Sequence, residues 1–215
     1  MMKFLRWRLM PRHFFDKVGR DWEAAWKQQV TPWELQSVNP SFAEALERLP
    51  KELHGRALVP GCGSGFDLFH LHAQGWDVTG IDISATAIEI ARANLQETPV
   101  NLHQGDFLKF NPSEPFDLIY DYLFFAAIDP SMRDDFATQF HALLRPKSGR
   151  LVTLLFPLAP PNAPAYSVGP PYPMSLDDYR QHFEAAGFHL ESSYTPTATI
   201  KPRKGRELLA IWSRT

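Results

Sequence analysis

The stretch LVPGCGSGFD, Leu58–Asp67, decides the fold because three closely spaced glycines join an apolar run to a helix-like pattern. The run RALVP at 56–60 comes directly before the first glycine and predicts a buried strand. A glycine loop between a strand and a helix lets a ligand approach the backbone at the carboxyl end of the strand. The stretch therefore predicts an α/β fold with a nucleotide-type site at residues 61–65.

The rest of the chain alternates strand-like and helix-like patterns, which is typical of a doubly wound parallel sheet. Apolar runs predict strands at 56–60, 77–83, 100–104, 116–122, 150–156, 188–194 and 207–212. Ser84 is a good N-cap for a helix over 85–95, and Ser175 with Asp178 forms a capping-box pattern before a helix that ends at Gly187. A short connection precedes the last strand and makes it antiparallel to its neighbour. We predict a seven-stranded, mostly parallel, Rossmann-like sheet with an antiparallel last strand.

Composition narrows the classes of protein that fit. The 215 residues suit one domain over 1–215, and the net charge of −2 gives no reason to expect nucleic acid as a partner. The single cysteine, Cys62, excludes an internal disulfide framework and a multi-thiolate metal site, and it fits a reducing compartment. No apolar run approaches the roughly 20 residues of a membrane span. We expect a cytoplasmic monomer without a metal and without a membrane partner.

The spacing of the glycines separates three classes of ligand. A dinucleotide fingerprint is G-x-G-x-x-G, but Gly61, Gly63 and Gly65 form G-x-G-x-G, and Phe66 stands where the third fingerprint glycine belongs. No Gly-Lys-Ser/Thr follows, so a Walker-type phosphate loop is excluded. S-adenosylmethionine remains as the ligand class with this spacing. It has an adenosine and an amino-acid tail but no phosphate.

Two further acidic positions favour that cofactor. Asp82 ends the second predicted strand about 20 residues after the first glycine, where a carboxylate can accept both ribose hydroxyls. Asp106 and Phe107 follow the third predicted strand, where an acid can bind the adenine amino group and an aromatic ring can flank the base. Each of these has a plain alternative, a turn for Asp106 and core packing for Phe107.

With these motifs in order, the chain resembles the class I methyltransferases of the thiopurine methyltransferase superfamily. The segments LVPGCGSGFD, VTGIDIS, GDF, FDLIYDYLFFAAIDP and GPPYPMS carry the likeness, which is greatest to the thiol, halide and thiocyanate branch. The resemblance implies that residues 1–40 form a cap or lid. It also implies that the cofactor site includes Trp22, Trp26, Trp33, Gly61, Gly63, Asp82, Asp106, Phe107 and Tyr122. An aromatic cap suits a sulfonium, because a ring face attracts a cation and excludes water.

The resemblance also bears on the acceptor. Tyr172 in VGPPYPMS matches a substrate-side tyrosine of the family, so we expect it to orient a small thiol or anion. Asp121, at the end of the fourth predicted strand, could accept the proton of a thiol directly or through water, although capping the following turn explains it equally well. The stretch ELQSVNP at 34–40 departs from the acid-then-glycine pattern usual in the family, which leaves the geometry of the entrance open.

The sequence leaves several acceptors and one other class of protein open. A small thiol or hydrosulfide ranks first, a halide or thiocyanate second and a thiopurine third. A nicotinamide-dependent oxidoreductase would need a glycine at Phe66 and a recognisable hydride-transfer residue, and the sequence shows neither. A protein that binds S-adenosylmethionine without turning it over remains the alternative from a different class.

Overall fold

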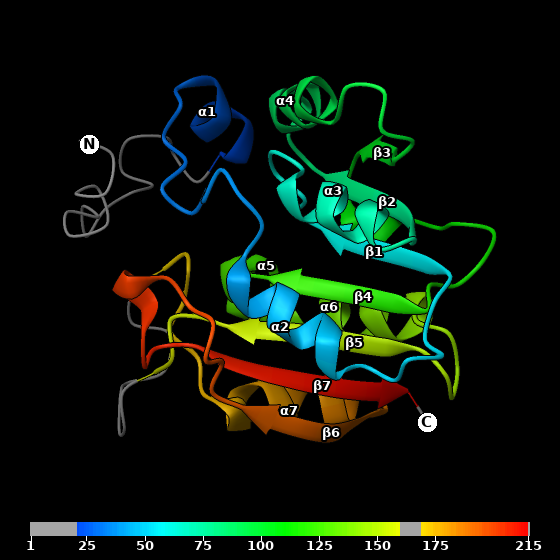
Figure 1. Ribbon diagram of the computed structural model, residues 1–215. Coiled ribbons are helices and arrows are strands. Elements are labelled where there is room, and N and C mark those ends of the chain that lie inside the picture. The colour runs from blue at the N-terminus through cyan, green and yellow to red at the C-terminus, as the bar shows by residue number, and fades with distance from the viewer. Residues whose placement is uncertain (1–20, 160–168, 215) are drawn as a thin grey trace.

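The computed structural model describes residues 21–159 and 169–214. Its centre is a seven-stranded sheet in the order β3-β2-β1-β4-β5-β7-β6 (Figure 1). The strands are β1 Arg56–Pro60, β2 Asp77–Asp82, β3 Asn101–Gln104, β4 Leu118–Tyr122, β5 Arg150–Leu155, β6 Phe188–Tyr194 and β7 Leu208–Arg214. Strand β7 runs antiparallel to both of its neighbours, and the other pairs are parallel. The predicted class of fold, with its antiparallel last strand, is confirmed.

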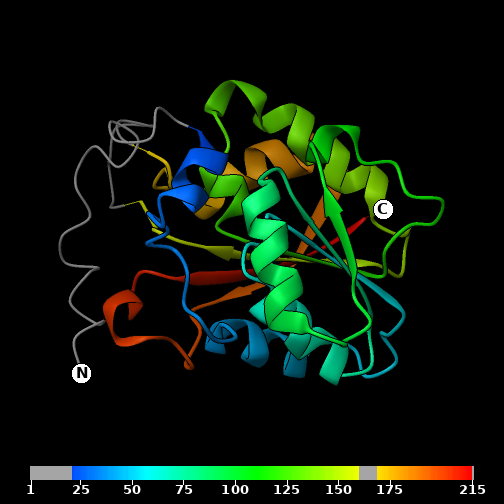
Figure 2. The same ribbon diagram turned by 90° about the horizontal axis from the view of Figure 1, so that it is seen from above.

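Helices cover both faces of the sheet, as the turned view shows (Figure 2). They are α1 Trp22–Lys27, α2 Pro40–Arg48, α3 Phe66–Ala73, α4 Ala85–Leu95, α5 Phe124–Ala127, α6 Arg133–Leu143 and α7 Leu176–Ala185. Apolar side chains of α2, α3 and α4 form one core cluster with the sheet, and those of α5, α6 and α7 form a second cluster on the opposite face. The result is the three-layer arrangement that alternating strands and helices predict.

Local sequence explains where several helices begin. The Ser84 hydroxyl accepts a hydrogen bond from the Ala87 N–H and starts α4, and Ser175 and Asp178 form the capping box that starts α7. Both starts are confirmed. The helix α2, which the sequence patterns did not predict, begins at Pro40 after Asn39, whose side-chain oxygen accepts from the Ser41 N–H. Asparagine at the N-cap followed by proline at the first helical position was the available signal for this helix.

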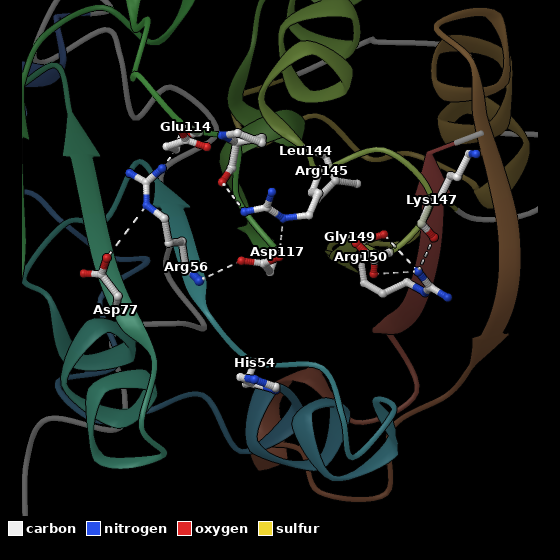
Figure 3. Close-up of polar contacts among 12 residues, drawn as sticks. His54, Arg56, Asp77, Glu114, Asp117, Leu144, Arg145, Lys147, Gly149 and Arg150 are labelled. Carbon is white, nitrogen blue, oxygen red and sulfur yellow. Dashed lines mark hydrogen bonds and ion pairs between the residues drawn. The ribbon is translucent and has the colours of Figure 1, made fainter.

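The amino ends of the central strands are joined by ion pairs (Figure 3). Asp117, just before β4, accepts hydrogen bonds from the Arg56 N–H at 2.9 Å and from Nε of Arg145 at 2.5 Å. At the start of β5, Arg150 pairs with Glu191 of β6 at 2.7 Å and donates to three backbone carbonyls before it. Acidic and basic groups at this edge of the sheet therefore satisfy one another.

The opposite edge is organised by the glycine loop. Gly61 and Gly63 have φ angles of +61° and +53°, a left-handed conformation that favours glycine. A Cβ on Gly61 would lie 2.6 Å from the Phe124 ring, and one on Gly63 would lie 2.5 Å from Oε1 of Glu34. Both positions therefore require glycine for conformation and for space. The loop lies at the carboxyl ends of the strands, where α/β sheets bind their ligands.

Candidate active site

A pocket opens at the carboxyl ends of β1, β2 and β4. Its empty volume, which includes space open to solvent, is about 850 Å³. It is lined by Trp22, Trp26, Trp33, Gly61, Gly63, Asp82, Ile83, Tyr122, Leu123, Phe124, Ala127, Ile128, Phe156, Pro170 and Pro171. Seven predicted cofactor residues are thus brought together from four segments of the chain: the three tryptophans, both glycines, Asp82 and Tyr122.

Asp82 joins the glycine loop to the end of β2. Its Oδ2 accepts from the Gly63 N–H at 3.0 Å, and its Oδ1 accepts from the Ser84 N–H at 2.9 Å. Burial raises the pKa of this carboxyl, while the two backbone hydrogen bonds act in the opposite direction. The carboxylate is 8% exposed and still lines the pocket, so it both fixes the loop and presents an acceptor to a ligand.

The tryptophans form an aromatic wall over the pocket. The rings of Trp22 and Trp33 meet edge to face with centroids 5.4 Å apart, and Trp26 and Trp33 meet in the same way at 6.2 Å. Such edge-to-face pairs fix ring positions as well as burying apolar area. The sequence predicted the three residues as a group, and the structure shows that α1 and the chain after it hold their rings together.

A carboxylate that the sequence reasoning missed holds this wall in place. Glu23 of α1 accepts hydrogen bonds from the Ser84 hydroxyl at 2.6 Å and from the backbone and side chain of Thr86 at 3.1 and 2.8 Å. These bonds, that from Ser84 first, lower the pKa of Glu23 to about 2. The charge therefore lies at the amino end of α4, where it also complements the helix dipole. An acid beside Trp22 was the only sequence signal for this contact.

The end of β4 supplies the floor of the pocket. The Tyr122 hydroxyl donates to the Trp33 carbonyl at 3.3 Å, and its ring lies 5.2 Å from the guanidinium of Arg203. Burial raises the pKa of the Tyr122 phenol, so the group stays protonated at neutral pH. Leu123 follows with a φ of +59° and turns the chain into α5, which brings Phe124 against Gly61. No sequence pattern predicts the left-handed conformation of Leu123.

Asp121 lies beneath the pocket and does not line it. It is fully buried, and its Oδ1 accepts from the Phe125 N–H at 2.9 Å. Its Oδ2 has no hydrogen-bond partner among the described residues. Burial raises the pKa of the Asp121 carboxyl to about 7. The structure thus shows the capping of the following turn that the sequence offered as one interpretation, together with an oxygen that caps nothing.

Asp106 and Phe107 are placed outside the lining of the pocket. The Asp106 carboxylate accepts from the Leu108 N–H and starts a short 3₁₀ helix, Phe107–Lys109. The Phe107 ring is 4% exposed and packs edge to face on Phe124 at 5.3 Å. Because Phe124 lines the pocket, Phe107 supports its wall from behind. The two residues follow the plain alternatives, a turn and core packing.

Tyr172 lies beside the pocket in the proline-rich segment. It is 7% exposed, its N–H donates to the Ala126 carbonyl at 2.7 Å, and its ring lies 5.4 Å from the guanidinium of Arg133. The two residues before it, Pro170 and Pro171, line the pocket. Residues 160–168 of the same segment and residues 1–20 of the predicted cap lie outside the described chain.

A second pocket of about 520 Å³ adjoins the first on the α2 and α3 side. The two share Trp33, Gly61, Tyr122 and Leu123 as lining residues. Sequence reasoning did not select its two carboxylates, although Asp67 ends the stretch LVPGCGSGFD and Glu34 begins the stretch ELQSVNP.

Two carboxylates lie in this second pocket. Glu34 accepts a hydrogen bond from the Ser64 hydroxyl, and Asp67 of α3 accepts from the Asn39 N–H at 3.0 Å. Burial raises the pKa of Glu34 to about 7, with smaller contributions from the charges of Asp67 and Asp82, and burial raises that of Asp67 to about 6.

Residues 21–159 and 169–214 contain no cluster of three or more histidine, cysteine, aspartate or glutamate side chains that could hold a metal ion. Over the same ranges, none of the helices has the length and apolar character needed to cross a membrane.

Two curated proteins with similar sequences are named as methyltransferases. The chain is 37% identical over 212 residues to "Probable thiol methyltransferase 2" of Arabidopsis thaliana, covering 96% of this chain and 90% of that protein. It is 34% identical over 197 residues to "Thiocyanate methyltransferase 1" of Brassica oleracea, and the match covers 90% of this chain and 84% of that protein.

Among solved structures, a Burkholderia thailandensis 1,6-didemethyltoxoflavin-N1-methyltransferase superposes with a TM-score of 0.73 at 20% identity, over 96% of this chain and 92% of that one. This likeness concerns the fold alone. The sequence model of the family described as Thiopurine S-methyltransferase (TPMT) matches residues 18–211, so the chain belongs to the thiopurine S-methyltransferase family, as its motifs predicted.

Proposed function

We propose that this protein transfers the methyl group of S-adenosylmethionine to a small thiol or hydrosulfide. The observation that carries the proposal is the pocket itself, which combines an aromatic wall, an open glycine loop and the Asp82 carboxylate. Membership in the S-methyltransferase family and the similarity to a plant protein named as a thiol methyltransferase support it.

The residues present fit this cofactor. The Asp82 carboxylate suits ribose hydroxyls, because it keeps lone pairs available beside its two backbone hydrogen bonds. The faces and edges of Trp22, Trp26 and Trp33 suit a sulfonium cation. Gly61 and Gly63 line the pocket without side chains, so only their backbone faces the ligand there. Neither Asp106 nor Phe107 is among the lining residues, and the Phe107 ring packs on Phe124. A contact of these two residues with the adenine would therefore have to be made on the side of the pocket formed by Phe124.

The chemistry needs little from the chain beyond binding and alignment. When bound, S-adenosylmethionine supplies an electrophilic methyl group on a positively charged sulfur. The aromatic wall excludes water and holds the nucleophile in line, which accounts for much of the rate enhancement such a displacement needs. Phe124 and Phe156 complete an apolar surface for a soft acceptor.

An acceptor thiol must also lose its proton. An unperturbed thiol has a pKa of about 8.5, so a few per cent is ionised at neutral pH and the site can select that fraction. Asp121, whose pKa burial raises to about 7, is the candidate base for the remaining thiol. Because its carboxyl lies beneath the lining, the proton would reach it through water.

Tyr172 is the candidate for orienting the acceptor. Its ring adjoins Arg133, and Pro170 and Pro171 carry the chain from it into the pocket lining. Halide or thiocyanate is the second candidate acceptor, favoured by the similarity to a protein named as a thiocyanate methyltransferase. A thiopurine is the third, and a protein that binds S-adenosylmethionine without turnover is the alternative from a different class. We further propose a cytoplasmic monomer with residues 1–40 as the cap of a single domain.

The test is a panel assay with purified protein and labelled S-adenosylmethionine. Hydrosulfide, methanethiol, aromatic thiols, iodide, thiocyanate and a thiopurine are offered in turn at pH 7.5. We expect kcat/KM to be highest for a small thiol or hydrosulfide. Highest turnover with iodide or thiocyanate would replace the proposed acceptor, and cofactor binding without any methylation would favour the sensor. No cofactor binding by calorimetry would remove the proposal.

A further inference from the structure

A carboxylate beside the aromatic wall joins two elements that are far apart in the sequence. Glu23 of α1 accepts hydrogen bonds from the Ser84 hydroxyl at 2.6 Å, from the Thr86 hydroxyl at 2.8 Å and from the Thr86 N–H at 3.1 Å. All three donors belong to the amino end of α4, which lies next to α1 (Figure 1). Both oxygens of the carboxylate are used, so the Glu23 side chain fixes the place of α1 relative to α4.

Apolar side chains in and after α1 form a small cluster of their own. Ala25 is fully buried, and around it pack Trp22, Ala24, Val30 and Trp33. This cluster is separate from the two clusters that cover the faces of the sheet. A segment with few apolar contacts to the main core opens at a lower free energy than the core itself. The hydrogen bonds of Glu23 therefore contribute strongly to holding the aromatic wall over the pocket.

Ser84 connects the Glu23 carboxylate to the Asp82 carboxylate. Ser84 is fully buried, its hydroxyl donates to Glu23, and its N–H donates to Oδ1 of Asp82 at 2.9 Å. The same hydroxyl accepts from the Ala87 N–H at 3.0 Å, so its position is fixed from both sides. With its other oxygen, Asp82 accepts from the Gly63 N–H at 3.0 Å. A continuous line of hydrogen bonds thus runs from α1 through Ser84 and Asp82 to the glycine loop.

We propose that Glu23 is a positioning residue that couples closure of the aromatic wall to binding of the ribose by Asp82. This inference rests on the proposed function, because the ribose belongs to the proposed cofactor. With Glu23 bound to Ser84 and Thr86, the wall covers the pocket and the Ser84 N–H holds Asp82 in place. Ribose hydroxyls that donate to Asp82 stabilise the same arrangement, so closure and ribose binding favour each other. Burial, and to a smaller extent the charge of Glu23, raise the pKa of Asp82, so the two carboxylates also interact through their charges.

The test compares two ligands that differ only at the ribose. S-Adenosylhomocysteine has both ribose hydroxyls, and its 2′-deoxy analogue lacks one of the two donors proposed for Asp82. Glu23→Gln removes the charge and one acceptor oxygen and keeps the size of the side chain. Glu89→Gln, the same substitution at an exposed position of α4, is the matched control. Affinities are measured by calorimetry at pH 7.5, and circular dichroism checks the fold of each variant.

We expect Glu23→Gln to weaken S-adenosylhomocysteine binding about 10-fold, the effect of a lost hydrogen bond to a charged group. Binding of the 2′-deoxy analogue should weaken less than about threefold, because part of the contact that Glu23 supports is already absent from that ligand. Glu89→Gln should change neither affinity. Thr86→Val removes one donor to Glu23 and leaves the charge in place, so it should give the same pattern with smaller losses.

The relative losses of the two ligands decide the inference. Equal losses would mean that Glu23 holds the wall without acting on Asp82, and they would overturn the coupling, as would no loss for either ligand. If Glu23→Gln does not fold, the same comparison is made with Thr86→Val. Failure of the unaltered protein to bind S-adenosylhomocysteine would instead remove the proposed function itself.

Discussion

Acidic groups at the amino ends of the parallel strands, the amino edge of the sheet, differ in their hydrogen bonds from those at the carboxyl ends, the carboxyl edge. At the amino edge, Asp117 has a backbone and a guanidinium donor, and both of its oxygens are used (Figure 3). At the carboxyl edge, four residues further along the chain, Asp121 is fully buried with an oxygen that has no partner among the described residues. Burial raises the pKa of Asp121, and also those of Asp82, Asp67 and Glu34.

We interpret this difference as a division between an edge that contributes stability and an edge that binds the ligand. A buried carboxylate without a cation destabilises the folded state when it is ionised, and pairing with an arginine removes that cost. Sites that bind ligands commonly retain such unfavourable groups, because the ligand supplies the missing interaction. The comparison therefore predicts that substitutions at the two edges change different quantities.

The largest expected effect is on the pH dependence of stability at Asp121. Its folded pKa, about 7, lies above the unfolded value of about 4, so its contribution to stability is present below pH 4 and is lost as the pH rises to 7. Between pH 5 and pH 8, the free energy of unfolding of the unaltered protein should fall by about 3 kcal/mol relative to Asp121→Asn. Urea denaturation at several pH values measures this difference.

The other carboxylates with raised pKa values are present in both proteins and cancel in that comparison. If the difference in free energy of unfolding between the unaltered protein and Asp121→Asn does not change with pH, Asp121 is not protonated in the folded state at neutral pH. In the methylation assay, the same variant tests the proposed base. If Asp121 takes the thiol proton, kcat should fall for thiols and not for iodide, which has no proton to lose.

The second prediction concerns Asp82, the carboxylate that lines the pocket. Asp82→Ala should weaken binding of S-adenosylhomocysteine by about 1–3 kcal/mol, because ribose hydroxyls would be left without an acceptor. Calorimetry gives this value directly. The variant also removes two backbone hydrogen bonds, so Asp82→Asn is the companion variant that retains an acceptor. Unchanged affinity in both would remove Asp82 from the site.

The third prediction tests the other edge. Asp117→Asn removes the charge that pairs with Arg145 and should lower the free energy of unfolding by about 1–2 kcal/mol, as for a partly buried charged hydrogen bond. Affinity for S-adenosylhomocysteine should stay within about twofold, since Asp117 lies just before β4 and is not a lining residue of either pocket. A large loss of affinity with no loss of stability would contradict the division between the two edges.

Sequence patterns were sufficient for the sheet, because strands and caps depend on local composition. The first and sixth predicted strands, 56–60 and 188–194, have the bounds of β1 and β6. The spacing of the glycines located the loop, because glycine adopts the positive φ values found at Gly61 and Gly63 more readily than other residues do. The short α5 had no such signal, because it begins after a leucine in a left-handed conformation.

Among the residues that line the pocket, sequence patterns predicted those in or next to a motif, such as Gly61, Gly63 and Asp82. Glu34 faces Ser64, thirty positions away, and Glu23 faces Ser84 and Thr86, so both contacts depend on how α1 and the following chain return to the sheet. The spacing of residues along the sequence does not predict such contacts between distant segments of the chain. Asp106 shows the reverse case, in which an acid at a family position is used by the local turn.

The smallest expected effect is at Tyr172, and it separates the acceptor from the cofactor. Tyr172→Phe keeps the buried ring beside Arg133 and the N–H bond to Ala126, so affinity for S-adenosylhomocysteine should change little. If its hydroxyl orients the acceptor, KM for a small thiol should rise about three- to tenfold, equivalent to about 1 kcal/mol for one neutral hydrogen bond. Steady-state kinetics with methanethiol measures this change. An unchanged KM would assign Tyr172 to packing and would leave the cofactor site as described, since Tyr172 is not a lining residue of the pocket.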